Sequence, residues 1–415
     1  MLRSKKDILF SLTTISLFLL LLNTATIYAN YFKSISYICL GLSGVISIVA
    51  IFIKGSISLK KYVIYYLIIL MTGFFINGIV SGFSIEILNY FLKFVIAYLI
   101  VDICYYLEDS FFKILYIVSA ILIVWALILY IITLLNINLS FLPVTDVYTT
   151  WWGQKRPLYA FVIMQLHQDM EFVGIGLNKL SYPLLEAGIA EIYANYCIFY
   201  LLFLTDKMKF KKLWVTFFII CSFLTLSLVG IATLFLIIAL YFIKTKRFIS
   251  VLFFVLVAVW VCSYFILEKI GTSSYNDRTN DYSFIFQTIK ENFPLGIGLG
   301  NMENTHRDYF INNQQTKSSF FSGLFSPLVY IGAFSLIYYI GLIKAFINSI
   351  REKGIVCRLS LAVIVILSLL TQPIAFTSII NVIIINGLYA NRNSKSYYLN
   401  KSGTNTIIQD HGSEE

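Results

Sequence analysis

Apolar runs of about 20 residues recur from one end of this chain to the other, separated by short polar segments. A run of this length forms a helix that can cross the hydrocarbon core of a bilayer, which is about 30 Å thick. Only 13% of the residues are charged, roughly half the share found in soluble domains. The sequence therefore predicts an all-α, polytopic membrane protein with little room for a soluble catalytic domain.

About twelve membrane-spanning helices are predicted from these runs. Residues 1–391 are expected to form a single integral-membrane domain, and residues 392–415 a polar tail. Two long apolar stretches are each predicted as two short spans, broken at Gly230 and at Pro373, because each is too long for one tilted helix. The predicted spans are 8–29, 34–53, 62–81, 85–106, 114–136, 183–205, 213–228, 229–243, 248–267, 323–343, 356–371 and 374–390.

The basic residues indicate which ends of the spans face the cytoplasm. Of the 31 Lys and Arg residues, 21 lie on one side of the predicted membrane, nine on the other, and Lys93 within a span. Since cytoplasmic loops carry the excess of Lys and Arg, both termini are predicted inside the cell, and the N-terminal run is expected to be a retained first span. The net charge of +10 needs no nucleic-acid partner, because its basic residues sit in these connections.

Two connections, 137–182 and 268–322, are much longer than the others, and both are predicted outside. The second contains "FPLGIGLGN" (293–301), with glycine at every second position. Glycine can bring backbone N–H groups close to a phosphate. The stretch does not lead from a strand into a helix, and an external loop meets no ATP, so a nucleotide-binding loop is not expected.

The two long connections share a pattern. "RPLYAFVIMQLHQDMEFVGIGLN" (156–178) and "RTNDYSFIFQTIKENFPLGIGLG" (278–300) align without gaps, and the alignment matches Arg156 with Arg278 and one "GIGL" with the other. Coincidence in a chain rich in Gly, Ile and Leu is the alternative. The interpretation is that the two loops are two versions of one structural and functional element, a device that occurs twice in the chain.

A short amphipathic helix is predicted between Arg278 and the glycines of the second loop. It is expected to lie in the outer interface, with its apolar face towards lipid or the bundle. The predicted apolar face consists of Tyr282, Ile285, Phe286, Ile289 and Phe293, with Asp281, Thr288, Lys290 and Glu291 opposite.

Three stretches resemble the bacterial O-antigen and capsular polysaccharide polymerases (the Wzy type) and the related O-antigen ligases. They are "FPLGIGLGN", "KSSFFSGLFSPLVYIGAFSLI" (317–337) and "LTLSLVGIATLFL" (224–236). The layout of spans and two large periplasmic loops is similar as well. Where ligases commonly have an arginine after the serine, this chain has Leu228, and where they have His-Asn it has Lys317 and Ser318. Both departures favour a polymerase over a ligase.

The resemblance implies transfer of a growing glycan from undecaprenyl pyrophosphate onto another lipid-linked repeat unit, at the outer face of the bacterial cytoplasmic (inner) membrane. It also implies membrane lipid and a chain-length regulator protein as partners. Pyrophosphate is already a good leaving group, so no cofactor is expected. The six cysteines are scattered singly and predict no metal site. The alternatives are an O-antigen ligase and a lipid-linked oligosaccharide flippase, a transporter that would concentrate its polar groups at mid-membrane.

Glycan transfer of this kind needs cations on the departing diphosphate and a base for the attacking hydroxyl. Arginine suits the first task because its planar cation contacts two phosphate oxygens at once. A cation that only reaches the membrane interface is the competing interpretation. The predicted catalytic residues are His306, Asp277 and Glu291. The predicted substrate-binding residues are Arg156, Arg278, Arg307, Lys317, Gly174, Gly176, Gly296, Gly298, Gly300 and His167.

Four charged residues fall inside predicted spans: Lys93, Asp102, Glu186 and Glu191. A charge in the membrane needs a partner or a wet cavity. For the two glutamates the sequence leaves two possibilities open, a glycan-binding groove and ion pairs between packed helices.

Overall fold

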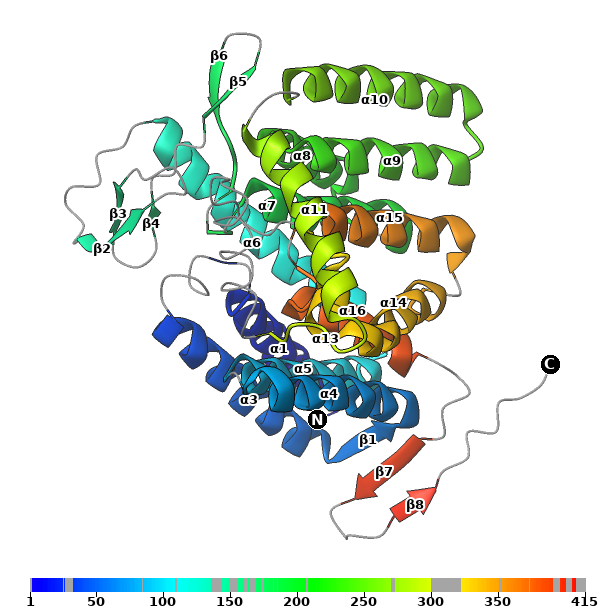
Figure 1. The fold of residues 1–415 in the computed structure, drawn as a ribbon. Helices are drawn as coiled ribbons and strands as arrows, with labels where there is room; N and C mark the ends of the chain where they lie inside the picture. Colours follow the sequence, from blue (N-terminus) through cyan, green and yellow to red (C-terminus); the bar gives the residue numbers. More distant parts are fainter. Residues whose placement is uncertain are drawn as a thin grey trace.

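The computed structural model describes residues 2–24, 26, 33–83, 85–108, 110–135, 144–149, 155–159, 163–164, 169–172, 175–181, 183–184, 186–206, 208–269, 273–299, 322–350, 353–372, 374–390, 396–400 and 405–407. Most of these residues form helices that pack side by side in one bundle, with short strands at its margins (Figure 1).

The helices confirm the predicted all-α class. Six described helical segments are long and apolar enough to cross a membrane, and four shorter helices are also apolar. Each of the twelve predicted spans overlaps a helix, but that all twelve cross the membrane stays a prediction. The helices are α1 (Leu2–Leu22), α3 (Lys33–Lys54), α4 (Lys61–Ser81), α5 (Ile85–Tyr106), α6 (Phe111–Leu134), α7 (Ala187–Phe199) with its π-helical extension η1 (Tyr200–Leu204), α8 (Lys211–Leu224), α9 (Leu228–Lys244), α10 (Phe248–Lys269), α11 (Ser273–Asn292), α13 (Ser326–Ile331), the 3-10 turn η2 (Gly332–Ser335), α14 (Leu336–Asn348), α15 (Ile355–Thr371) and α16 (Ser378–Tyr389).

The first predicted break point is wrong by a few residues. Gly230 lies inside α9, and the chain turns instead at Leu226, whose φ is +48°. Ser227 caps α9 just before its first residue, Leu228, because its hydroxyl oxygen accepts a hydrogen bond from the N–H of Gly230. The second pair of short helices separates between residues 372 and 377, next to Pro373, which itself lies outside the described residues.

The centre of the bundle is formed by α7 and α16, in which every residue is buried. Helices α1 and α3 pack closely because they meet through small side chains. The hydroxyl of Ser16 lies 3.0 Å from that of Ser43 and 2.7 Å from that of Ser47. Helix α10 lies at the margin, packed mainly against α9 (Figure 1).

Short strands, which the sequence did not predict, lie outside the bundle. In the first long connection, β2 (Val144–Thr149), β3 (Lys155–Tyr159) and β4 (Ile163–Met164) form one antiparallel sheet, and β5 (Asp169–Phe172) and β6 (Ile175–Asn178) form a hairpin. Part of the predicted polar tail forms β7 (Ser396–Asn400) and β8 (Asn405–Ile407). Strand β7 pairs with β1 (Ser56–Lys60), which follows α3.

Both long connections leave the bundle at one end, which we call the loop end. There the N–H of Leu180 donates to the carbonyl of Leu224 over 2.8 Å, and the hydroxyl of Tyr282 donates to that of Leu370 over 3.1 Å. The segment that follows the first connection therefore contacts the end of α8, and the helix of the second connection contacts the end of α15.

The opposite end, which we call the lysine end, carries short connections rich in lysine. The Lys244 amine contacts the Phe203 carbonyl over 3.5 Å, which joins the ends of α9 and η1. Lys6 forms an exposed ion pair with Glu108 in the turn after α5. The hydrogen bond from Lys6 lowers the pKa of Glu108. The separation of the two ends fits the predicted charge pattern, and which end faces the cytoplasm stays a prediction.

Candidate functional site

The glycine-rich stretch forms a tight turn, residues 293–298, that is fixed to α13. The N–H of Ile297 donates to the Val329 carbonyl over 2.9 Å, and the N–H of Gly298 to the Tyr330 carbonyl over 3.0 Å. The side-chain amide of Asn77, on α4, donates to the carbonyls of Leu295 and Tyr330 over 2.7 and 2.9 Å. This glycine turn therefore ties the end of α11 to both α4 and α13.

Glycine is needed in this turn for both conformation and space. Gly296 and Gly298 have φ values of +81° and +84°, which side-chain-bearing residues rarely adopt. A Cβ on Gly296 would lie 2.7 Å from backbone atoms of Val329 and Tyr330. The close approach is thus made to the protein's own backbone.

This arrangement corrects the predicted phosphate cradle. The N–H of Gly296 donates to the Asn292 carbonyl over 2.9 Å, and those of Ile297 and Gly298 donate to α13. None of these three amides is left to bind an anion. Gly296 and Gly298 consequently act by shaping the turn, and Gly300 lies outside the described residues.

Helix α11 lies at the loop end beside α13, as Figure 1 shows. Its buried side chains are Phe284 and Ile285, which pack with Ile297 and Val329, together with Thr288. The predicted helix is therefore present, and Ile285 of its predicted apolar face packs against the bundle. Phe286 and Phe293 of the same face are 58% and 61% exposed, which leaves them free to contact lipid, whereas Thr288, assigned to the opposite face, is buried against expectation.

The two long connections do not have the same structure. In the first, residues 155–178 contribute β3 to β6, and the aligned residues of the second form α11 and the glycine turn. Gly176 lies in β6 opposite Glu171, and Arg156 lies in β3 opposite Tyr148 of β2. The interpretation of the two loops as versions of one device is wrong at the level of secondary structure.

The predicted site residues are distributed unevenly over the described chain. Glu291 lies on the exposed side of α11, where its carboxylate accepts a hydrogen bond of 2.8 Å from Gln287. Asp277 and Arg278 lie on the first half of α11, and for these two, as for Arg156, the backbone alone is described. The residues His167, Gly174, Gly300, His306, Arg307 and Lys317 lie outside the described residues.

A polar and aromatic cluster at the loop end was missed by sequence reasoning. Tyr90 of α5 donates a 2.9 Å hydrogen bond to Asn381 of α16. The Phe376 ring, between α15 and α16, lies 5.2 Å from that of Tyr90 and 5.7 Å from that of Tyr330. Through Tyr330 this cluster adjoins the glycine turn and Asn77. Its members come from three distant segments, and only single Asn and Tyr residues in apolar runs signal it in the sequence.

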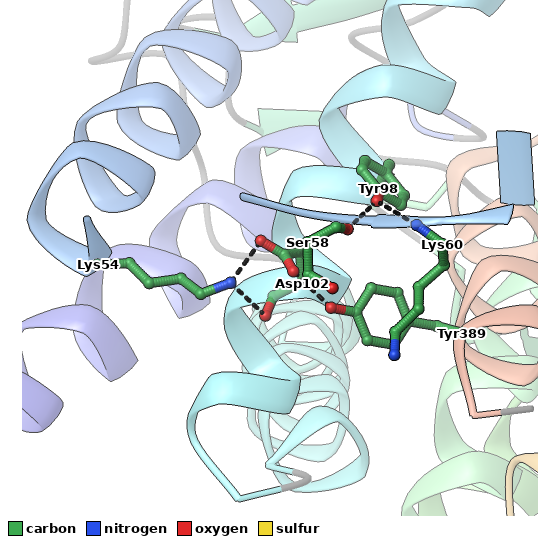
Figure 2. A network of polar contacts seen from close by, with 6 residues as sticks. All are labelled: Lys54, Ser58, Lys60, Tyr98, Asp102 and Tyr389. Atoms are coloured by element: carbon green, nitrogen blue, oxygen red, sulfur yellow. Dashed lines mark hydrogen bonds and ion pairs between the residues drawn. The ribbon is translucent and has the colours of Figure 1, made fainter. Parts of the chain in front are cut away.

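Asp102, one of the charges predicted to need a partner, has several at the lysine end (Figure 2). Its carboxylate forms an ion pair of 2.5 Å with Lys54 and accepts a hydrogen bond from the Tyr389 hydroxyl. Both side chains of the ion pair are almost fully buried. Next to it, Tyr98 donates to the Ser58 carbonyl and so joins α5 to β1. These contacts connect α3, α5 and α16, and they give Asp102 a structural role.

The two glutamates predicted for the span after the first loop differ in position. Glu186 is half-buried at the start of α7, and Glu191 is buried against α9. A Cβ on Gly230 would lie 2.0 Å from a carboxylate oxygen of Glu191. One turn further along, Asn195 donates to the Gly230 carbonyl over 3.0 Å and accepts from Ser222 over 3.2 Å. For Glu191, these contacts favour helix packing over a glycan groove.

The described part of the loop end thus has an exposed carboxylate at Glu291 on α11 and packed aromatic rings at the junction of α4, α5 and α16. In comparisons with protein-family models, curated proteins and solved structures, the chain matched none.

Proposed function

We propose that this chain polymerises polyprenyl-pyrophosphate-linked oligosaccharide repeat units at the outer face of a bacterial cytoplasmic membrane. One observation carries the proposal: both long connections, which contain the predicted arginines and histidines, join the bundle at the same end. Two lipid-linked substrates anchored in one membrane could both be reached from that end.

In the proposed reaction a sugar hydroxyl of the acceptor unit attacks the anomeric carbon of the donor glycan, and the bond from that carbon to the pyrophosphate oxygen breaks. The hydroxyl proton passes to a carboxylate or histidine, for which Glu291, Asp277 and His306 are the proposed groups. The leaving pyrophosphate carries the negative charge, which Arg156, Arg278, Arg307 and Lys317 are proposed to stabilise.

The test is a reconstitution of the purified protein in liposomes with undecaprenyl-pyrophosphate-linked repeat units as the only substrate. A polymerase produces a ladder of longer lipid-linked glycans on a gel. Arg278→Ala should abolish the ladder, and Lys290→Ala, which removes an exposed cation from the same helix, should leave it unchanged. Product that forms only after addition of a lipid A-core acceptor would indicate a ligase, and translocation without extension would indicate a flippase.

A further inference from the structure

Helix α5 contains two buried charged residues, and only one of them has an ion-pair partner among the described residues. Asp102 is 0% exposed and is neutralised by Lys54. Lys93 is 9% exposed, yet among the described residues no hydrogen bond or ion pair within 4.0 Å reaches its amine. Its acidic neighbour is Glu86, two helical turns closer to the loop end and exposed at the start of the helix. Glu86 offsets the charge of Lys93 from a distance without closing an ion pair.

A second polar group on the same face also lacks a partner. Asn89 lies one turn before Lys93, and its side-chain oxygen is buried without a hydrogen bond. Residues four apart on a helix are neighbours on its surface. A buried cation and the buried side-chain oxygen of Asn89 therefore lie side by side, and among the described residues neither has a hydrogen-bond partner.

The position of Lys93 suits a lipid phosphate. Lys93 is eight residues from Ile85, the first residue of α5, which places its Cα about 12 Å along the helix from the loop end. Helical side chains point towards the N-terminus of their helix, so the amine extends back towards the loop end. An unpaired cation inside a membrane protein is costly and marks a route for an anion.

We propose that Lys93 binds the diphosphate of the polyprenyl-linked substrate within the helix bundle. The unpaired oxygen of Asn89 is a hydrogen-bond acceptor, so it is not itself a phosphate contact. The inference rests on the proposed function, since it names where that substrate's anion lies. The diphosphate supplies the direct ion pair that no described residue makes with Lys93, and the polyprenyl chain remains in the hydrocarbon.

The experiment measures binding and stability of the full-length protein in detergent, without glycan transfer. Three probes are titrated by native mass spectrometry: undecaprenyl diphosphate, undecaprenol and inorganic pyrophosphate. Lys93→Met removes the charge at similar length, and Lys93→Arg keeps it. Lys54→Met is the matched control, because it removes a buried lysine whose partner lies in the protein.

The wild type should bind undecaprenyl diphosphate, and bind undecaprenol and pyrophosphate far more weakly. Lys93→Met should weaken undecaprenyl diphosphate binding about tenfold or more, the loss of one charge-assisted contact, and Lys93→Arg should retain most of it. The thermal midpoint of Lys93→Met should be unchanged or higher, because an unneutralised buried charge is removed. That of Lys54→Met should fall while binding remains.

The proposal is overturned if Lys93→Met binds undecaprenyl diphosphate like the wild type, or if it lowers the midpoint as Lys54→Met does. Pyrophosphate binding equal to that of the lipid would assign the site to a soluble anion and would equally contradict the proposal. Intact, Lys93-dependent lipid binding with no polymer ladder would contradict the polymerase assignment and leave the anion site standing.

Discussion

Single residues decide whether the glycine turn can form. Gly296 combines a left-handed φ with backbone atoms at 2.7 Å from any added Cβ, so Gly296→Ala should destabilise the protein by about 2 kcal/mol. Gly41→Ala is the control, because Gly41 lies in α3 with nothing within 4 Å of an added Cβ. It should be neutral or stabilise by about 0.5 kcal/mol. Unfolding in detergent measures both, and equal effects would contradict the close contact.

At the scale of single residues, the sequence indicated which residues require an interaction partner but not which residues are the partners. The spacing of Gly296 and Gly298 predicted a close backbone approach to another group, and Gly296 makes one, to Val329 and Tyr330. The sequence could not show that carbonyls of α13 accept hydrogen bonds from these backbone amides, because α13 begins about 30 residues later. Likewise Asp102 was predicted to need a partner, and its partners Lys54 and Tyr389 lie 48 and 287 residues away. No local pattern encodes such pairings.

Among the elements, α11 offers the sharpest test of a helix face. Phe284 is fully buried against Val329, and Phe286, two residues on, is 58% exposed. Phe284→Ala should therefore destabilise the protein by about 3 kcal/mol, and Phe286→Ala by less than about 1 kcal/mol. Denaturant unfolding gives both values. The opposite order would restore the face predicted from the sequence.

Hydrophobic periodicity predicted the existence of α11 correctly and its orientation only in part. The pattern identifies apolar residues, and at a membrane surface an apolar side chain can contact either lipid or protein. Phe286 and Phe293 therefore do not indicate which side of the helix contacts α13.

The strands of the first long connection could not be predicted from the repeated letters either. Alignment of "GIGL" with "GIGL" compares letters, whereas pairing between β5 and β6 depends on the residues that precede each copy.

For the whole molecule, the charge pattern predicts which end faces the cytoplasm. Reporters fused at Gln154 and Asn301 should be active outside the cell, and reporters at Lys209 and Glu352 inside, because the short connections carry most of the lysine and arginine. Alkaline phosphatase and green fluorescent protein fusions distinguish the two sides. A cytoplasmic signal from either long connection would remove the basis for the proposed function.

The glycine turn also fixes one end of the second long connection. It fixes the chain at Gly298, and the Leu324 N–H, hydrogen-bonded to Leu369 over 2.7 Å, fixes it again on the far side of the second connection. The second long connection therefore leaves the bundle and rejoins it at two fixed points of the loop end. Fixing both ends of a connection lowers its chain entropy before any substrate binds, so less entropy is lost when the connection orders around a substrate.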